Sequence, residues 1–196
     1  MDALTVPASC SVALKEWASV LAAIGRGEQL VLIRKGGLIE PGSGFELMAQ
    51  TFVFYPTFEH QTVHFLRPAS HALFDEALRT RPPQGVVPIE LVGIATASAA
   101  SHDSGIVERL GAFHIYNDAF LSQRLKWQPE QPLVIVTVRA FRLPTPCRLT
   151  VTGRYAGCRS WVELERPVSL EGARPVLDDA TFQQRAARLA ALLTAR

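Results

Sequence analysis

Residues 132–143, PLVIVTVRAFRL, are the part of the chain with the strongest preference for extended structure. The five residues from Val134 to Val138 are all β-branched, and no charged residue interrupts them. Such a run is typical of a strand that is buried on both of its faces. We therefore take this stretch as the central strand of a sheet.

Further strands are predicted on both sides of this central strand. VVPIELVGIATAS at 86–98 precedes it, and PTP at 144–146 predicts a turn that leads into CRLTVT at 147–152. RSWVELE at 159–165 is the next extended stretch. Strands that follow one another with only turns between them favour antiparallel pairing.

The N-terminal half combines a predicted helix with a predicted hairpin. Apolar residues at intervals of three and four predict an amphipathic helix over 11–25, with polar side chains on its solvent face. QLVLIRKGG at 29–37 predicts a strand that ends in a glycine turn, and 45–55 predicts a second strand that pairs back with it. The polar side chains that we place on the wet face of the helix are Lys15, Glu16 and Ser19.

The remaining segments complete the expected architecture. TFEHQTVHFL at 57–66 is interpreted as a further extended piece, and helices are predicted over 70–80, 117–127 and 179–194. The fold class expected is α+β, a mostly antiparallel, barrel-like sheet with N-terminal, middle and C-terminal helices. We expect a single domain over 1–196, in which RPPQG at 81–85 is the candidate internal boundary.

Composition narrows the class of protein. Hydrophobic residues make up 48% of the chain and charged residues 19%, which argues against intrinsic disorder. Of the 20 basic residues only three are lysines, and guanidinium groups suit the recognition of phosphate and carboxylate. Three widely spaced cysteines without a C-x-x-C pair, together with the lack of a signal peptide or a long apolar run, predict a cytoplasmic protein that does not enter a membrane.

YPTFEHQTVHF at 55–65 gathers more groups able to bind or transfer protons than any other segment. On a strand, His60 and His64 would lie about 13 Å apart, too far for a two-histidine chelate. The same geometry would place Glu59 beside Gln61 on one face. With Glu40 or Glu46, Glu59 would then supply oxygens to a divalent cation such as Mg²⁺, although simple pairing with nearby cations explains these residues as well.

IRKGGLIE at 33–40 is the second candidate segment. Arg34 and Lys35 supply positive charge, while Gly36 and Gly37 allow a phosphate to approach the backbone closely. A tight turn with exposed cations explains the same residues. The spacing does not match the nucleotide-binding loops of the P-loop or Rossmann type.

RYAGCRSWVELE at 154–165 is the third candidate segment. Arg154 and Arg159 flank a glycine and Cys158, so the thiol would lie in a positively charged loop that favours the thiolate. Trp161 next to Arg159 is a pair of the kind that stacks on an unpaired base. Burial of the cysteine and the tryptophan in the core is the alternative for both.

Four motifs together resemble an uncharacterised bacterial family, the domain of unknown function catalogued as 1802. They are ALKEWASVL at 13–21, LVLIRKGGLIE at 30–40, FYPTFEHQ at 54–61 and YAGCRSWVEL at 155–164. The resemblance covers about residues 12–165 and is accompanied by a more distant similarity to small PUA-like barrels. It implies no established activity, but it implies that the matching positions form one site: Arg34, Lys35, Gly36, Gly37, Glu40, Pro56, Glu59, His60, Gln61, Gly157, Cys158 and Trp161.

These features favour a binding module that recognises RNA, single-stranded DNA or a nucleotide-like ligand. Arg34, Lys35, Arg154 and Arg159 would contact phosphate, Trp161 or Tyr55 would stack on a base, and Glu59, His60 and Gln61 would read polar edges. One alternative is a Mg²⁺-dependent phosphodiesterase or nuclease in which Glu59, His60 or Lys35 is catalytic. A protein-interaction domain is the other.

Overall fold

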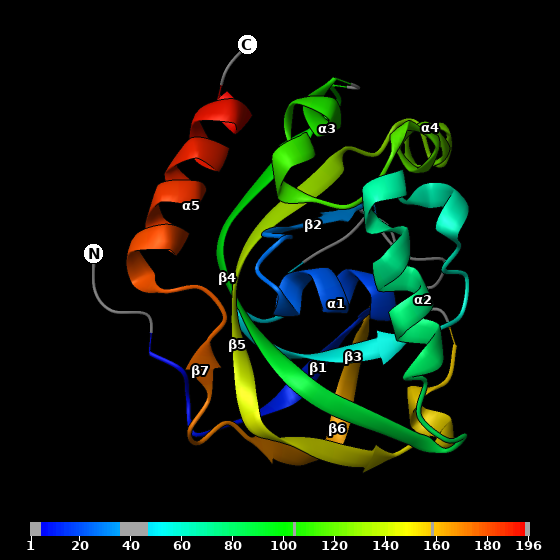
Figure 1. Cartoon of the computed structure of the whole chain (residues 1–196), viewed down its shortest axis with the longest axis vertical. Helices are drawn as coiled ribbons and strands as arrows, with labels where there is room; N and C mark the ends of the chain where they lie inside the picture. Colours follow the sequence, from blue (N-terminus) through cyan, green and yellow to red (C-terminus); the bar gives the residue numbers. More distant parts are fainter. Residues whose placement is uncertain (1–4, 36–46, 104, 158, 195–196) are drawn as a thin grey trace.

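The computed structural model describes residues 5–35, 47–103, 105–157 and 159–194, which form one seven-stranded sheet accompanied by helices (Figure 1). The strands are β1 (Ser9–Trp17), β2 (Val31–Arg34), β3 (Thr51–Thr57), β4 (Val86–Ser101), β5 (Leu133–Thr150), β6 (Trp161–Ser169) and β7 (Arg174–Pro175). The α-helices are α1 (Ala18–Gly25), α2 (His71–Arg79), α3 (Ile106–Arg109), α4 (Asp118–Lys126) and α5 (Asp179–Thr194).

The predicted α+β class with a mostly antiparallel sheet is confirmed. The strand order is β2-β5-β4-β3-β1-β6, and β7 lies beside β5. Within the described residues, β1 and β3 run parallel and the other strand pairs are antiparallel. The long strands β4 and β5 curve around α1, but the sheet does not close, because β2 and β6 remain its two edges (Figure 1).

The central strand was predicted correctly but ends later than expected. β5 is buried over most of 133–143, as its β-branched run indicated, and it continues to Thr150. The turn predicted at PTP is therefore wrong. Its two prolines lie between Arg142 and Cys147, where the pairing with β4 shifts register, so their missing N–H groups are tolerated.

The helix predicted over 11–25 is wrong in its first half, because Ser9–Trp17 is the strand β1 and only Ala18–Gly25 is helical. β1 lies between β3 and β6, which satisfy its backbone on both sides. Ala13 and Leu14 are fully buried. Pairing on both edges outweighs a helical spacing that was only one interpretation of these apolar positions.

The hairpin predicted for 29–55 is also wrong. β2 pairs with β5, whereas β3 begins at Thr51 and pairs with β1 and β4. The expected glycine turn lies outside the described residues. The extended piece predicted for 57–66 is wrong as well, since the chain turns at His60, which has a φ of 61°, and forms a 3-10 helix over Val63–Phe65.

The other helices agree with the prediction. α2 and α5 lie where apolar spacing placed them, and Asn117 caps α4 by accepting hydrogen bonds from the N–H groups of Ala119 and Phe120 at 3.1 and 3.2 Å. In the parts of the chain that the structure describes, none of the helices has both the length and the apolar character needed to cross a membrane.

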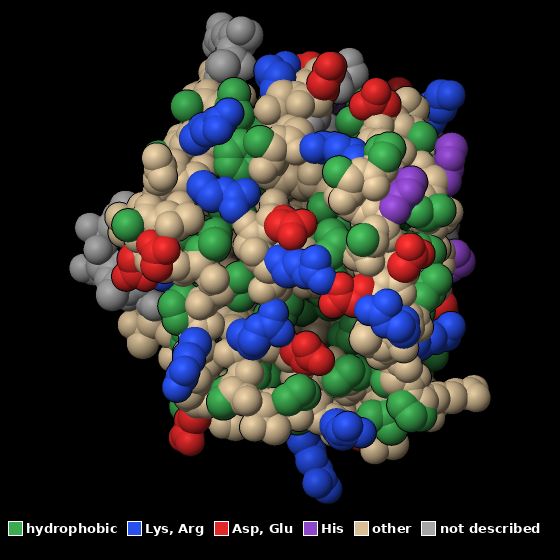
Figure 2. Space-filling view, in the orientation of Figure 1, with side chains coloured by type: hydrophobic (Ala, Val, Ile, Leu, Met, Phe, Trp, Pro, Cys, Tyr) green, Lys and Arg blue, Asp and Glu red, His purple; other side chains and the backbone are tan. Residues whose placement is uncertain are grey.

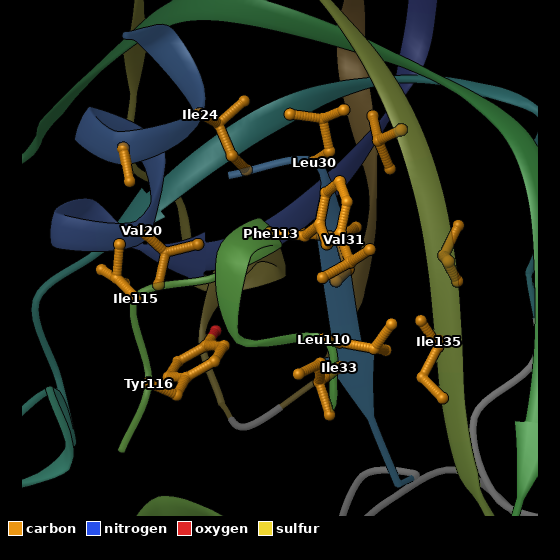
Figure 3. Close-up of a cluster of buried hydrophobic side chains, with 14 of the residues drawn as sticks. Val20, Ile24, Leu30, Val31, Ile33, Leu110, Phe113, Ile115, Tyr116 and Ile135 are labelled. Atoms are coloured by element: carbon orange, nitrogen blue, oxygen red, sulfur yellow. The ribbon is translucent and has the colours of Figure 1, made fainter. Parts of the chain in front are cut away.

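The main core lies between α1 and the inner face of the sheet. Val20 from α1, Val31 from β2 and Phe113 from the segment before α4 converge there (Figure 3). A second cluster on the other side of the sheet includes Val53 and Tyr155. The sheet is therefore covered on both faces around β1 and β3, which limits where a ligand can reach these strands.

Gly93 on β4 generates a stability prediction. A Cβ atom at this position would lie 2.9 Å from side-chain carbons of Phe52, Phe54 and Val138, closer than packed atoms allow. Gly93→Ala should lower the free energy of unfolding by about 1–3 kcal/mol through overpacking. Urea denaturation followed by tryptophan fluorescence measures this.

Gly153→Ala is the matched control, because nothing lies within 4 Å of the added methyl group. It should change stability by no more than about 0.5 kcal/mol. Equal destabilisation by the two substitutions would contradict the packing described around Gly93.

Candidate functional site

The candidate site lies where β1 and β3 end. Because the two strands are parallel and adjacent, Lys15 and Glu16 at the end of β1 align with Tyr55 and Pro56 at the end of β3. The end of β2 reaches the same region through Arg34. We use the name junction cluster for the charged residues at these strand ends: Lys15, Glu16, Arg34, Lys35 and Arg124. Lys15 and Glu16 are consecutive on β1, so their side chains lie on opposite faces of the strand.

A buried ion pair joins β1 to β2. Arg34 donates from Nη2 to Glu16 Oε2 at 2.9 Å and to the carbonyl oxygen of Lys15 at 2.7 Å. Glu16 is only 7% exposed, and its Oε1 accepts the N–H of Trp17 at 2.8 Å. A buried carboxylate with this set of donors is held in one orientation, and removal of either partner would leave a buried charge uncompensated.

Arg124 from α4 adds a second guanidinium group to this ion pair. Its guanidinium carbon lies 5.0 Å from the ring centre of Phe120, and its Nε is buried without a hydrogen-bond partner among the described residues. Burial lowers the pKa of Arg124, and the positive charge of Arg34 lowers that pKa further. The two guanidinium groups are therefore close enough to repel one another.

Lys35, directly after β2, is a buried cation. Its side chain is only 2% exposed, and Nζ donates to the carbonyl oxygen of Leu125 at 2.9 Å. Burial lowers the pKa of Lys35 below its usual range. Within the described ranges of the chain, no carboxylate forms an ion pair with Lys35.

Lys15 contacts the third candidate segment, RYAGCRSWVELE at 154–165. Its ammonium donates to the carbonyl oxygens of Tyr155 and Gly157, the latter at 2.8 Å, and lies 5.7 Å from the ring centre of Tyr55. Tyr55 and Tyr155 meet edge to face at 6.1 Å. Burial raises the pKa of Tyr55, and the negative charge of Glu59 adds to this effect, which places Glu59 at the margin of the cluster.

Gln61 is anchored against α1. Its Oε1 accepts hydrogen bonds from the backbone N–H and the hydroxyl of Ser19, both at 3.3 Å, while its Nε2 is buried without a partner in the described part of the chain. Glu59 and His60 are exposed in the turn before it. The alternation that was to place Glu59 beside Gln61 does not apply, because this segment is not a strand.

Tyr116 lies on the buried side of the cluster. Its ring stacks on Phe120 with centres 3.9 Å apart, and burial together with the negative charge of Glu16 raises its pKa. Arg34 and Arg124 act on that pKa in the opposite direction. The hydroxyl of Tyr116 is thus protonated and within electrostatic reach of the ion pair.

The other predicted residues lie apart from these contacts. Trp161 is 7% exposed and packs edge to face on Phe52 at 5.3 Å, so its ring belongs to the core. Arg154 and Arg159 are exposed near the loop that Lys15 holds. The predicted positions outside the described residues are Gly36, Gly37, Glu40, Glu46 and Cys158.

The predicted metal site consists of Glu59 with Glu40 or Glu46. In the described ranges, no three His, Cys, Asp or Glu side chains are grouped so that they could hold a metal ion. Glu59 is described and exposed, while its two proposed co-ligands lie outside the described residues.

Sequence reasoning missed four members of this region. Lys15 and Glu16 were placed on the wet side of a helix, and Arg124 and Tyr116 were not singled out. One signal was available for the first two: LKEW places two charges inside a segment whose other residues are almost all apolar. Arg124 reaches the cluster because of the way α4 packs, and the local sequence pattern does not predict that packing.

Comparison with solved structures finds two matches of low sequence identity. A serine-to-alanine mutant of an ASCH protein from Zymomonas mobilis is 12% identical, and the match covers 93% of this chain and 99% of that one with a TM-score of 0.45. The crystal structure of ASCH from Zymomonas mobilis is 10% identical, covers 91% and 94% of the two chains, and gives a TM-score of 0.46.

Comparison by sequence gives a family. A search of curated proteins finds no match. The family described as "Domain of unknown function (DUF1802)" matches residues 13–188, a range that begins within β1, contains the four motifs and reaches into α5. The resemblance that the motifs indicated is therefore confirmed, and the chain belongs to the DUF1802 family.

Proposed function

We propose that this protein is a binding module for an anionic ligand of the nucleic-acid type, RNA or single-stranded DNA, which binds at the junction cluster. The observation that carries the proposal is the excess of positive charge there. Among the residues that the structure describes, Arg34, Lys35 and Arg124 bring three cations to the side of β1 that carries Glu16, and Lys15 adds a fourth cation on the other face of the strand.

The energetics of this excess favour an anion. The pKa values of Lys35 and Arg124 are lowered by burial, and that of Arg124 also by Arg34, so the fold bears a cost for keeping these groups charged. A phosphate that approaches them would offset that cost with charge-assisted hydrogen bonds. Groups held at an energetic cost to the fold are characteristic of functional sites.

The surroundings of the cluster suit a polymeric ligand better than an isolated phosphate. Arg154 and Arg159 extend positive charge along the exposed loop that Lys15 anchors. Glu59 and His60 are exposed on the neighbouring turn, where they would contact the polar groups of bases. Backbone contacts would then supply affinity, and the turn after β3 would supply selectivity.

Arg124→Gln tests the proposed contact with phosphate. The substitution should weaken binding of a fluorescein-labelled single-stranded RNA about tenfold and reduce the salt slope of the binding constant by about one. Arg188→Gln is the control, because Arg188 is an exposed arginine on α5. Fluorescence anisotropy over 50–300 mM salt measures both quantities, with a DNA of the same sequence in parallel.

Absence of salt-sensitive binding to either nucleic acid would refute the proposal. Equal loss in the two arginine variants would refute the assignment to the junction cluster. Electrophoresis of the labelled strands after incubation with Mg²⁺ shows in addition whether a bound ligand is cleaved.

Lys35→Met tests whether the buried ammonium serves binding at the expense of stability. Because no described carboxylate pairs with this buried ammonium, its replacement by an apolar side chain should leave the free energy of unfolding unchanged or raise it by up to ~1 kcal/mol. Nucleic-acid binding should weaken in the same variant. Thermal unfolding and anisotropy measure the two effects.

The pH dependence of the Lys35→Met variant follows from the sign of the pKa shift. Because the folded pKa of Lys35 lies below its ordinary value of 10.5, wild type gains stability relative to the variant as pH rises toward 10.5. Lys126→Met is the control, since Lys126 is exposed at the end of α4. Marked destabilisation of Lys35→Met at pH 7 would show that the ammonium serves the fold instead.

A further inference from the structure

A second concave site lies apart from the junction cluster, between α1, α2 and the sheet. It is a cleft of about 230 Å³ whose apolar wall includes Leu21, Phe54 and Leu91. Figure 2 shows this face hollowed, with acidic and basic side chains interspersed around the opening. Pockets for drug-sized ligands are usually larger, from ~300 Å³ upwards, so the cleft suits a smaller molecule.

The rim of the cleft carries charges of both signs in equal number. Arg26 pairs with Glu76, and Arg142 Nη1 lies 3.6 Å from Glu90 Oε2. All four side chains are between 37% and 49% exposed. Ion pairs in such exposed positions contribute little to stability, typically ~0–1 kcal/mol, so they can rearrange around a ligand at low cost.

Of the two rim arginines, Arg142 is the better positioned to bind a ligand. Its Nη2 donates to the carbonyl oxygen of Gly25 at 2.8 Å, which fixes the guanidinium at the end of α1. A Cβ at Gly25 would lie 2.6 Å from that Nη2, so a glycine is what permits the contact. The separation from Glu90 exceeds hydrogen-bonding distance, so both groups retain unused hydrogen-bonding capacity.

This arrangement selects the charge of the occupant. A simple anion attracted to Arg142 would meet Glu90 and Glu76, and a simple cation would meet both arginines. A zwitterion whose carboxylate faces Arg142 and whose ammonium faces Glu90 would form an antiparallel pair of dipoles with the rim. Its apolar side chain would then cover Leu21, Phe54 and Leu91.

We propose that the cleft between α1 and α2 binds a free α-amino acid with an apolar side chain. Arg142 binds the carboxylate, Glu90 binds the ammonium group, and the apolar wall receives the side chain. This site is independent of the nucleic-acid interface proposed above, because it uses none of the residues of the junction cluster.

L-Leucine is the probe in a titration of the full chain by NMR or calorimetry. Three analogues each lack one recognised feature: leucinamide lacks the carboxylate, 4-methylpentanoate lacks the ammonium group, and glycine lacks the side chain. Each should bind at least tenfold more weakly than L-leucine. Guanosine and adenosine test the competing idea that the cleft holds a base.

Two variants test the location of binding. Glu90→Gln should weaken L-leucine about tenfold and should strengthen 4-methylpentanoate, because it removes the partner of the ammonium group and also a negative charge that repels the carboxylate. Ala22→Phe fills the cleft from α1 and should abolish binding, with circular dichroism and thermal unfolding to verify that the variant is folded. Glu171→Gln is an exposed control outside the cleft and should behave as wild type.

Each possible result of these titrations either supports or overturns the amino-acid proposal. Binding of L-leucine that is lost in Ala22→Phe and weakened in Glu90→Gln supports the proposal, whether or not the protein binds nucleic acid. No saturable binding of L-leucine, equal binding of 4-methylpentanoate, or full binding by the folded Ala22→Phe variant would overturn it. Preferential binding of a nucleoside would overturn the assigned ligand class.

Discussion

The parallel pairing of β1 with β3 is the constraint on which the rest of the structure depends. It places two chain segments 40 residues apart in register, with Lys15 opposite Tyr55, and makes both strands end at the same edge. Strand β6 occupies the other side of β1, so β1 is interior to the sheet. The charged residues at its end are thereby forced into partly buried positions where they must find partners.

Those partners come from every region that the family motifs cover. Arg34 arrives on β2, Tyr55 on β3, and the backbone of Tyr155 and Gly157 from the loop before β6. Each of these three segments therefore contacts one of the two charged side chains of β1, Lys15 or Glu16. Parallel strands with a common end are a frequent location for binding residues, since the chain leaves the sheet there and can diverge without disturbing the core.

Among the described residues, the junction cluster has more positive than negative side chains, whereas the rim of the α1–α2 cleft has equal numbers of both. In the first, Lys35 is buried and the Nε of Arg124 has no hydrogen-bond partner among the described residues, which favours an incoming anion. In the second, half-exposed arginines and glutamates neutralise one another in pairs. Strand β3 contributes to both, since Tyr55 contacts Lys15 while Phe54 and Pro56 line the cleft.

The sequence by itself determined the elements whose side chains carry an unambiguous period: the β-branched run of β5, the capped helix α4, the helices α2 and α5, and through them the α+β class. Only the tertiary structure decided the state of β1, the partner of β2 and the turn at His60. The local pattern of β1 fits both a helix and a strand, that of β2 predicts a strand but not its partner, and that of 57–66 resembles a strand although the chain turns there. Backbone hydrogen bonds to distant strands then decide the conformation, and no window of sequence contains that information.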